Sequence, residues 1–118
     1  MSINYEDQAR VFSAFCDEKR LKILDLLKNG EKCACVLTPQ LGIAQSTLSY
    51  HMKILCEAGI VESREEGKWT HYSISREGGG LALSMLREIV SCPAAVTDGC
   101  CSEQPTAESK FTGAYYQF

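Results

Sequence analysis

The stretch that decides the fold is Gln45-Ser46-Thr47-Leu48-Ser49-Tyr50-His51-Met52-Lys53-Ile54-Leu55-Cys56-Glu57-Ala58-Gly59. Its apolar residues Leu48, Met52 and Leu55 recur at i, i+4 and i+7, which predicts an amphipathic helix over residues 45–58. Gly59 follows at the position where helices commonly stop. The opposite face of this helix is polar and is therefore expected to be available to a partner.

Three helices are predicted before it, over residues 5–15, 18–28 and 33–41. Asp17 is expected to cap the second helix, and Gly42 is expected to end the third. Pro39 fits the third helix poorly unless it falls in the first turn, because proline has no N–H for a helical hydrogen bond.

A β-hairpin and a last helix are predicted after it. The β-prone runs 60–64 and 69–74 flank a turn at 65–68 that contains a glycine. The run 78–80 is all glycine and is expected to break the chain before an amphipathic helix at 81–90. Residues 92–118 show no periodicity and are expected to form a mobile tail that carries cysteines, so the chain divides into a domain at 1–91 and a tail at 92–118.

A short helix, a turn, a longer helix with a polar face and then a hairpin is the order of a winged helix-turn-helix, which indicates DNA binding. We expect the fold to be mostly α, with about five helices and a small β-hairpin wing. Amides, hydroxyls and cations on the fourth helix and the hairpin suit base edges and phosphates. The candidates are Gln45, Ser46, Thr47, Ser49, Tyr50, Lys53, Arg64 and Lys68. The alternative is that the polar residues only cap and solvate a surface helix, and His51 is expected to be structural rather than a metal ligand.

Two of the seven cysteines, Cys33 and Cys35, stand at the start of the third predicted helix. A helix N-terminus and the neighbouring Lys32 are expected to lower the pKa of these thiols. Thiolates select soft or thiophilic ions, so zinc, cadmium, lead, cuprous copper and trivalent arsenic or antimony are all plausible ligands.

The composition narrows the class of protein. The chain has 118 residues, 45% hydrophobic and 23% charged, with a net charge of −3. No apolar run is long enough for a membrane span, and residues 1–7 carry acid where a secretory signal carries Lys or Arg, so a cytoplasmic protein is expected. An enzyme is not expected, because there are two histidines and no glycine-rich phosphate loop.

Four segments resemble the ArsR/SmtB family of metalloregulatory repressors, in particular its arsenic-responsive branch. They are residues 14–24, 45–52, 58–61 and 67–72. The resemblance implies a homodimer that binds double-stranded operator DNA and is released by an inducer, here trivalent arsenic or antimony. In the arsenic-sensing branch a third cysteine follows the Cys-x-Cys pair, and here that place is Thr38.

The remaining thiols leave alternatives open. Cys92, Cys100 and Cys101 can form a second site or complete the first, as some family members bind arsenicals through C-terminal cysteines. Cys16 and Cys56 are expected to be small buried hydrophobes, although some family members build sites at such positions. The last predicted helix has no histidine, which argues against the zinc site of the zinc-sensing branch.

Two other functions remain open at this point. One is a repressor of the same fold whose thiols sense oxidation. The other is a cytosolic metal-binding protein with no role on DNA.

Overall fold

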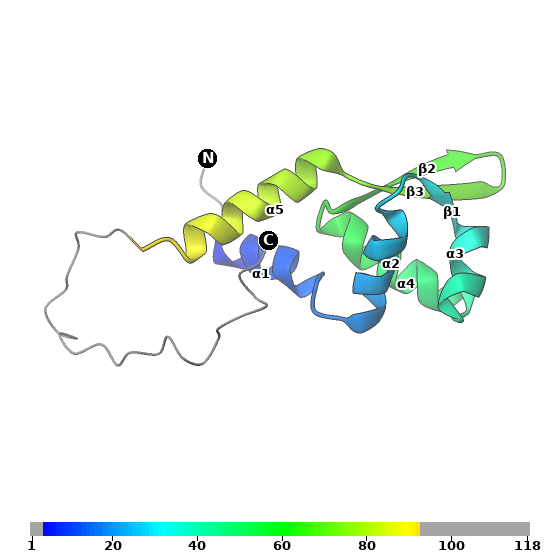
Figure 1. Ribbon diagram of the computed structural model, residues 1–118, viewed down its shortest axis with the longest axis horizontal. Helices are drawn as coiled ribbons and strands as arrows, with labels where there is room; N and C mark the ends of the chain where they lie inside the picture. The colour runs from blue at the N-terminus through cyan, green and yellow to red at the C-terminus, as the bar shows by residue number, and fades with distance from the viewer. Residues whose placement is uncertain (1–3, 93–118) are drawn as a thin grey trace, which may run out of the picture.

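The structure is a computed structural model that describes residues 4–92. The predictions for the rest of the tail, including its mobility and the roles of Cys100 and Cys101, concern residues outside this range. Within them the elements are α1 Tyr5–Ser13, α2 Glu18–Leu27, β1 Lys32–Cys33, α3 Ala34–Leu41, α4 Gln45–Glu57, β2 Val61–Glu66, β3 Trp69–Ile74 and α5 Arg76–Ile89. Figure 1 shows α1 beside α5 at one end and α3 with the sheet at the other. No helix in residues 4–92 is long and apolar enough to cross a membrane.

The apolar stripe predicted on α4 forms the centre of the core. Leu48, Met52 and Leu55 are fully buried and pack with Ile23 of α2 and Leu37 of α3. The helix-turn-helix pair α3–α4 is therefore held on α2 by the residues whose spacing predicted it. The order of elements in the whole domain is that of the predicted winged helix-turn-helix.

A buried arginine joins α1, α2 and α4. Arg20 is only 7% exposed, and its Nε donates to the carbonyl oxygen of Ala14 at 2.9 Å. One Nη lies 3.0 Å from Nδ1 of His51, and the other donates to the carbonyl oxygen of Ser13 at 3.3 Å. Because a guanidinium can only donate, Nδ1 is the acceptor and the proton of His51 is on Nε2. His51 is thus a buried structural residue, as expected.

The predicted cap at the start of α2 and the predicted end of α3 are both confirmed. The carboxylate of Asp17 accepts hydrogen bonds from the backbone N–H groups of Lys19 and Arg20, at 2.8 and 3.2 Å. Gly42 ends α3 with φ of 67°, a left-handed conformation that favours glycine. Pro39 lies in the interior of α3 and not in its first turn, so the helix forms despite the poor fit that the sequence indicated for proline there.

The sheet has three strands, where two were predicted. Strand β1 pairs antiparallel with β3, in the order β1-β3-β2. A strand of two residues has no alternation to detect, which is why the sequence pattern missed it. Cys33 consequently ends a strand, and α3 begins at Ala34 rather than at Cys33.

The three glycines at 78–80 do not break the chain, because they lie inside α5. The helix starts at Arg76, where the hydroxyl of Ser75 accepts a hydrogen bond from the N–H of Gly78 at 3.0 Å. A Cβ at Gly78 would overlap the carbonyl oxygen of Gly59, at the end of α4. Glycine here allows α5 to approach the backbone that follows α4, and this close contact overrides the low helix propensity of the run.

Gly78→Ala is therefore expected to lower the free energy of unfolding by about 2 kcal/mol, since the added methyl group forces two backbones apart. Gly80→Ala is the matched control, because a Cβ there meets nothing within 4 Å. Alanine is the better helix former, so the control is expected to keep or raise stability by up to about 1 kcal/mol. Urea unfolding followed by circular dichroism measures both, and equal midpoints for the two variants would contradict the close contact.

Candidate thiol site and nucleic-acid interface

The predicted thiol pair is brought together at the junction of β1 and α3. The Sγ atoms of Cys33 and Cys35 are 2.8 Å apart, with the Cys35 thiol donating to the sulfur of Cys33. The same sulfur accepts from the backbone N–H of Cys35 at 3.4 Å and so caps α3. The side chain of Cys33 thus caps α3, and its sulfur atom lies beside the second soft donor, the sulfur of Cys35.

The backbone of the thiol site belongs to the sheet that carries the wing. Lys32 is paired with Tyr72, and Cys33 is paired with His71 on β3. Along its length β3 also pairs with β2, from Ile74 to Trp69 at the tip. The backbone of Cys33 is therefore in direct contact with the strand that carries the wing.

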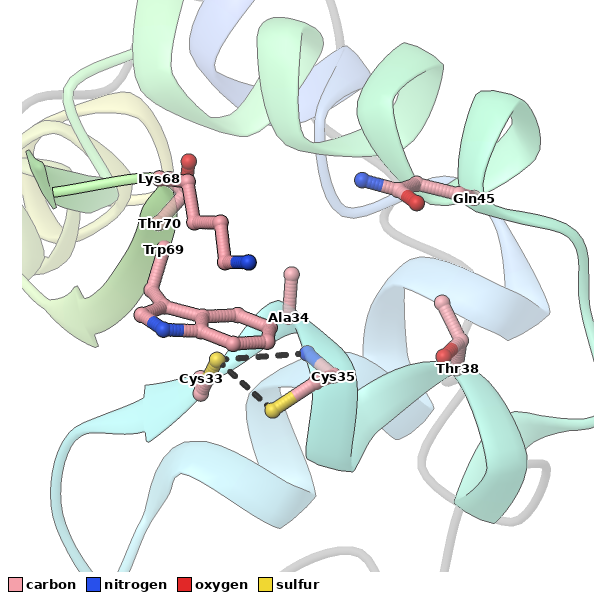
Figure 2. A pocket seen from close by; sticks show the side chains of 8 residues that line it. All are labelled: Cys33, Ala34, Cys35, Thr38, Gln45, Lys68, Trp69 and Thr70. Atoms are coloured by element: carbon pink, nitrogen blue, oxygen red, sulfur yellow. Dashed lines mark hydrogen bonds between the residues drawn. The ribbon is translucent and has the colours of Figure 1, made fainter.

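A hollow of about 230 Å³ opens between the thiols, the start of α4 and the wing. It is lined by Cys33, Ala34, Cys35, Thr38, Gln45, Lys68, Trp69 and Thr70. Figure 2 shows the indole of Trp69 beside the two sulfur atoms, with Lys68 reaching over the ring and Thr38 further along α3. Two predicted DNA contacts, Gln45 and Lys68, thus share one hollow with both predicted thiol ligands.

The acidity of the pair differs from the expectation. The pKa of Cys35 is raised, first because its thiol proton is held in the hydrogen bond to Cys33, then by partial burial and by repulsion from the Cys33 thiolate. The backbone N–H at the helix start lowers this pKa, but its effect is smaller. The expected lowering of the pKa was therefore wrong for Cys35, because the neighbouring thiol outweighs the backbone N–H group.

Within residues 4–92 no cluster of three His, Cys, Asp or Glu side chains is placed to hold a metal ion. Thr38 lines the hollow where a third sulfur would stand, so the described donor set consists of two thiols. Cys16 is exposed, contrary to the expectation that it is buried. Cys56 is half-buried against the core and its pKa is raised by burial, which suits a small hydrophobe.

The start of α4 presents the predicted polar face to solvent. Gln45, Ser46, Ser49, Tyr50 and Lys53 are exposed, and Thr47 is half-buried. The helix is capped by Ala44, whose side chain makes no capping hydrogen bond. Its first N–H groups therefore keep the capacity to bind an anion such as a phosphate oxygen.

The two predicted wing residues are placed differently. Arg64 forms a two-pronged ion pair with Glu31, with N–O distances of 2.8 and 3.0 Å, and a further contact of 3.3 Å with Glu66. This pairing lowers the pKa of Glu31. The ammonium of Lys68 lies 5.5 Å from the ring centre of Trp69, near the tip of the hairpin. Lys68 is thus near the hairpin tip without an ion pair to a described carboxylate, whereas Arg64 is engaged by Glu31 and Glu66.

Sequence reasoning overlooked Glu31 and Trp69. No local pattern connects Glu31 with Arg64, because 33 positions separate them. Trp69 carried a usable signal: it is the single tryptophan of the chain and stands beside a polar turn, where a large exposed aromatic ring needs an explanation.

Cys33→Ala is expected to lower the pKa of Cys35, since it removes both the hydrogen-bond partner and the neighbouring negative charge. Because the thiolate is the reactive form, alkylation of Cys35 by iodoacetamide should become faster at mildly alkaline pH, and its rate profile should move to lower pH. Peptide mass spectrometry measures this, with Cys56 in the same protein as internal control. A Cys35 profile that does not move would contradict the coupling of the two thiols.

Comparison with known proteins agrees with this architecture. Residues 17–63 match the bacterial regulatory protein, arsR family. An uncharacterized HTH-type transcriptional regulator of Methanocaldococcus jannaschii is 48% identical over 71 residues, which cover 59% of this chain and 80% of that protein. The arsenical resistance operon repressor of Escherichia coli is 36% identical over 84 residues, covering 70% of this chain and 72% of the relative.

A solved structure gives the same result for the fold. The homodimeric winged helix-turn-helix DNA-binding domain of a possible ArsR-family regulator from Mycobacterium bovis superposes with a TM-score of 0.60 at 31% identity, over 71% of this chain and 78% of that one. These proteins are transcriptional regulators and not enzymes, which confirms the prediction that this chain is not an enzyme. The chain belongs to the ArsR family of winged helix-turn-helix transcriptional repressors.

Proposed function

We propose that this repressor binds operator DNA as a homodimer and leaves it when trivalent arsenic or antimony, or another soft ion, binds Cys33 and Cys35. The observation that carries the proposal is the shared hollow, which is lined by the two thiols, by Gln45 of α4 and by Lys68 of the wing. A ligand on the sulfur atoms occupies space between the two elements that are expected to hold DNA.

DNA contact is proposed for the exposed start of α4 and for the wing. Amide and hydroxyl groups suit base edges, and the cations suit phosphates. The proposed residues are Gln45, Ser46, Thr47, Ser49, Tyr50, Lys53, Arg64 and Lys68. Arg64 reaches DNA only by leaving or sharing its pair with Glu31, so Lys68 is the readier wing contact.

The homodimer is supported by the uncovered apolar surface of α5. Leu81, Leu83, Leu86, Ile89 and Val90 are all large, apolar and exposed. Beside them Phe12 of α1 and Phe15, just after α1, line an almost wholly apolar groove of about 420 Å³. A contiguous apolar face of this kind is typical of an interface between subunits, and it lies away from the thiol hollow.

Release is proposed to follow from the position of Cys33 and Cys35. A ligand that bridges both sulfur atoms replaces the hydrogen bond between them and the cap of α3. The end of β1 then shifts against β3, and the start of α3 shifts beneath α4. A ligand that is compatible with only one arrangement of these elements changes the affinity for DNA by linkage.

The same geometry also suits one alternative function. Two adjacent sulfur atoms are also placed to respond to an oxidant, which would make the chain a redox-sensing repressor. The two functions separate under a strong phosphine reductant, where arsenite can bind but disulfides do not persist.

The proposal is tested by fluorescence anisotropy with the DNA upstream of the gene, titrated with arsenite in that reductant. Arsenite is expected to weaken wild-type binding by roughly 10- to 100-fold, the usual range for coupling between two sites. Cys33→Ser/Cys35→Ser should bind DNA as the wild type does and no longer respond. Cys100→Ser/Cys101→Ser is the matched control and should respond normally. A response lost only in the control pair would move the sensor away from the described thiol site.

Glu31→Gln is expected to strengthen DNA binding, because it removes the two-pronged ion pair of Arg64 and leaves only the contact with Glu66 to compete with a phosphate. The slope of log affinity against log salt concentration should steepen by roughly 1, the increment for one further phosphate contact. Glu62 lies on β2, as Arg64 does, and Glu62→Gln makes the same change in charge without altering the Arg64–Glu31 ion pair. A steeper slope in both variants would indicate a general charge effect and would contradict the specific role of Arg64.

A further inference from the structure

An exposed lysine and an exposed aromatic ring are neighbours at the tip of the wing. Lys68 and Trp69 follow Gly67, whose φ of 62° gives the hairpin its left-handed turn position. The backbone of Trp69 is fixed in the sheet, because it pairs with Glu66 at the end of the β2–β3 ladder. Its indole is nevertheless 49% exposed. Since burial of an indole stabilises a fold, a half-exposed one on a proposed DNA-binding element indicates a role other than packing.

The ammonium group of Lys68 lies over the indole of Trp69. Its Nζ atom is 5.5 Å from the ring centre, which is within the range of a cation–π contact. Figure 2 shows the side chain of Lys68 crossing the ring, with its ammonium group in the hollow that Gln45 of α4 also lines. The ring therefore holds the cation on the side of the wing that faces the start of α4.

A carboxylate close to Lys68 in the sequence already has other partners. Glu66 lies 3.3 Å from a guanidinium nitrogen of Arg64 and 3.3 Å from Nε2 of His71. Among the residues that the structure describes, Lys68 forms no ion pair with a carboxylate, and its contact is with the ring. The two cations of the wing are thus held differently, Arg64 by acids and Lys68 by an aromatic face.

This difference decides which cation is ready to bind an anion. A carboxylate neutralises its partner and must be displaced before the N–H groups reach another anion, as Glu31 must be for Arg64. An aromatic face attracts a cation through its quadrupole but carries no net charge, and it leaves N–H groups on the far side free to donate. Ordering a long side chain is one of the costs of binding, and the ring orders Lys68 before DNA arrives.

We propose that Trp69 is a positioning residue for DNA binding, which holds Lys68 in the orientation needed for a phosphate contact between the wing and α4. This inference rests on the proposed function, because it takes Lys68 as a contact to DNA. The indole acts through the lysine and is not itself the contact. The inference is independent of the inducer, so every measurement below is made without one.

The contact itself is measured in the free protein by NMR. The ε-methylene protons of a lysine that lies over an indole face are shifted upfield by the ring current. In the wild type, those of Lys68 should therefore resonate upfield of those of the other lysines. The shift is expected to disappear in Trp69→Leu, which keeps an apolar side chain without an aromatic face. An ordinary position in the wild type, or a shift that survives in Trp69→Leu, would overturn the inference.

The effect on DNA is measured by fluorescence anisotropy with the full chain and a labelled duplex from upstream of its gene. Trp69→Leu is expected to weaken binding roughly two- to fivefold, which corresponds to the strength of one exposed cation–π contact. Trp69→Phe is the matched control and should restore most of the affinity, since a phenyl face also attracts a cation. Equal losses in the two variants would contradict a role of the aromatic face.

A double mutant decides whether Trp69 acts through Lys68. Lys68→Ala is expected to weaken binding and to lower the slope of log affinity against log salt concentration by roughly 1, the loss of one phosphate contact. In the Lys68→Ala protein, Trp69→Leu should cause no further loss, because no cation is left to hold. A loss that persists in this background would mean that the indole contacts DNA itself or only supports the fold, and would overturn the inference.

Failure of the proposed function gives a different pattern. If Lys68→Ala binds DNA as tightly as the wild type and with the same slope, the proposed wing contact is wrong, and the inference falls with it. If Lys68→Ala loses a phosphate contact but Trp69→Leu binds as the wild type does, the wing contact stands and the positioning role is wrong. Neither result bears on release through Cys33 and Cys35, because no inducer is present.

Discussion

The orientation of α4 depends on the buried guanidinium of Arg20. A charged group inside a protein is costly unless its N–H groups are paired, and here they reach two carbonyl groups at the end of α1 and the ring of His51 on α4. Apolar contacts alone would tolerate small shifts of α4 along α2. The directional contact to His51 does not, so the exposed face of α4 is held in one orientation relative to the rest of the domain.

Local patterns were sufficient for most of the fold. The spacing of Leu48, Met52 and Leu55 predicted the core helix, and Asp17 and Gly42 marked helix ends through hydrogen bonding and backbone conformation. The errors arose where a distant segment decides the local structure. Strand β1 exists because β3 pairs with it, and Gly78 belongs to a helix because the chain after α4 passes beside it.

The site was predictable to a similar extent. Softness and spacing selected Cys33 and Cys35 as candidate ligands, and the structure shows only that their sulfur atoms are adjacent and that the polar start of α4 is exposed. The acidity of Cys35 was misjudged, because the helix end was considered and the adjacent sulfur atom was not. The engagement of Arg64 by Glu31 and the place of Trp69 in the hollow depend on tertiary contacts that no local pattern contains.

Cys33 belongs to both the fold and the candidate site, since it is the last residue of β1, the cap of α3 and one of two neighbouring thiols. A ligand on its sulfur atom therefore competes with the hydrogen bond that closes the helix. The backbone of Cys33 is paired with His71 on β3. A ligand that displaces Cys33 would therefore also act on this strand, which begins at Trp69, next to Lys68. In the proposed mechanism, a change of one bond at this residue reaches both α4 and the wing without passing through the apolar core, and such a short connection suits a small ligand that moves two surfaces together.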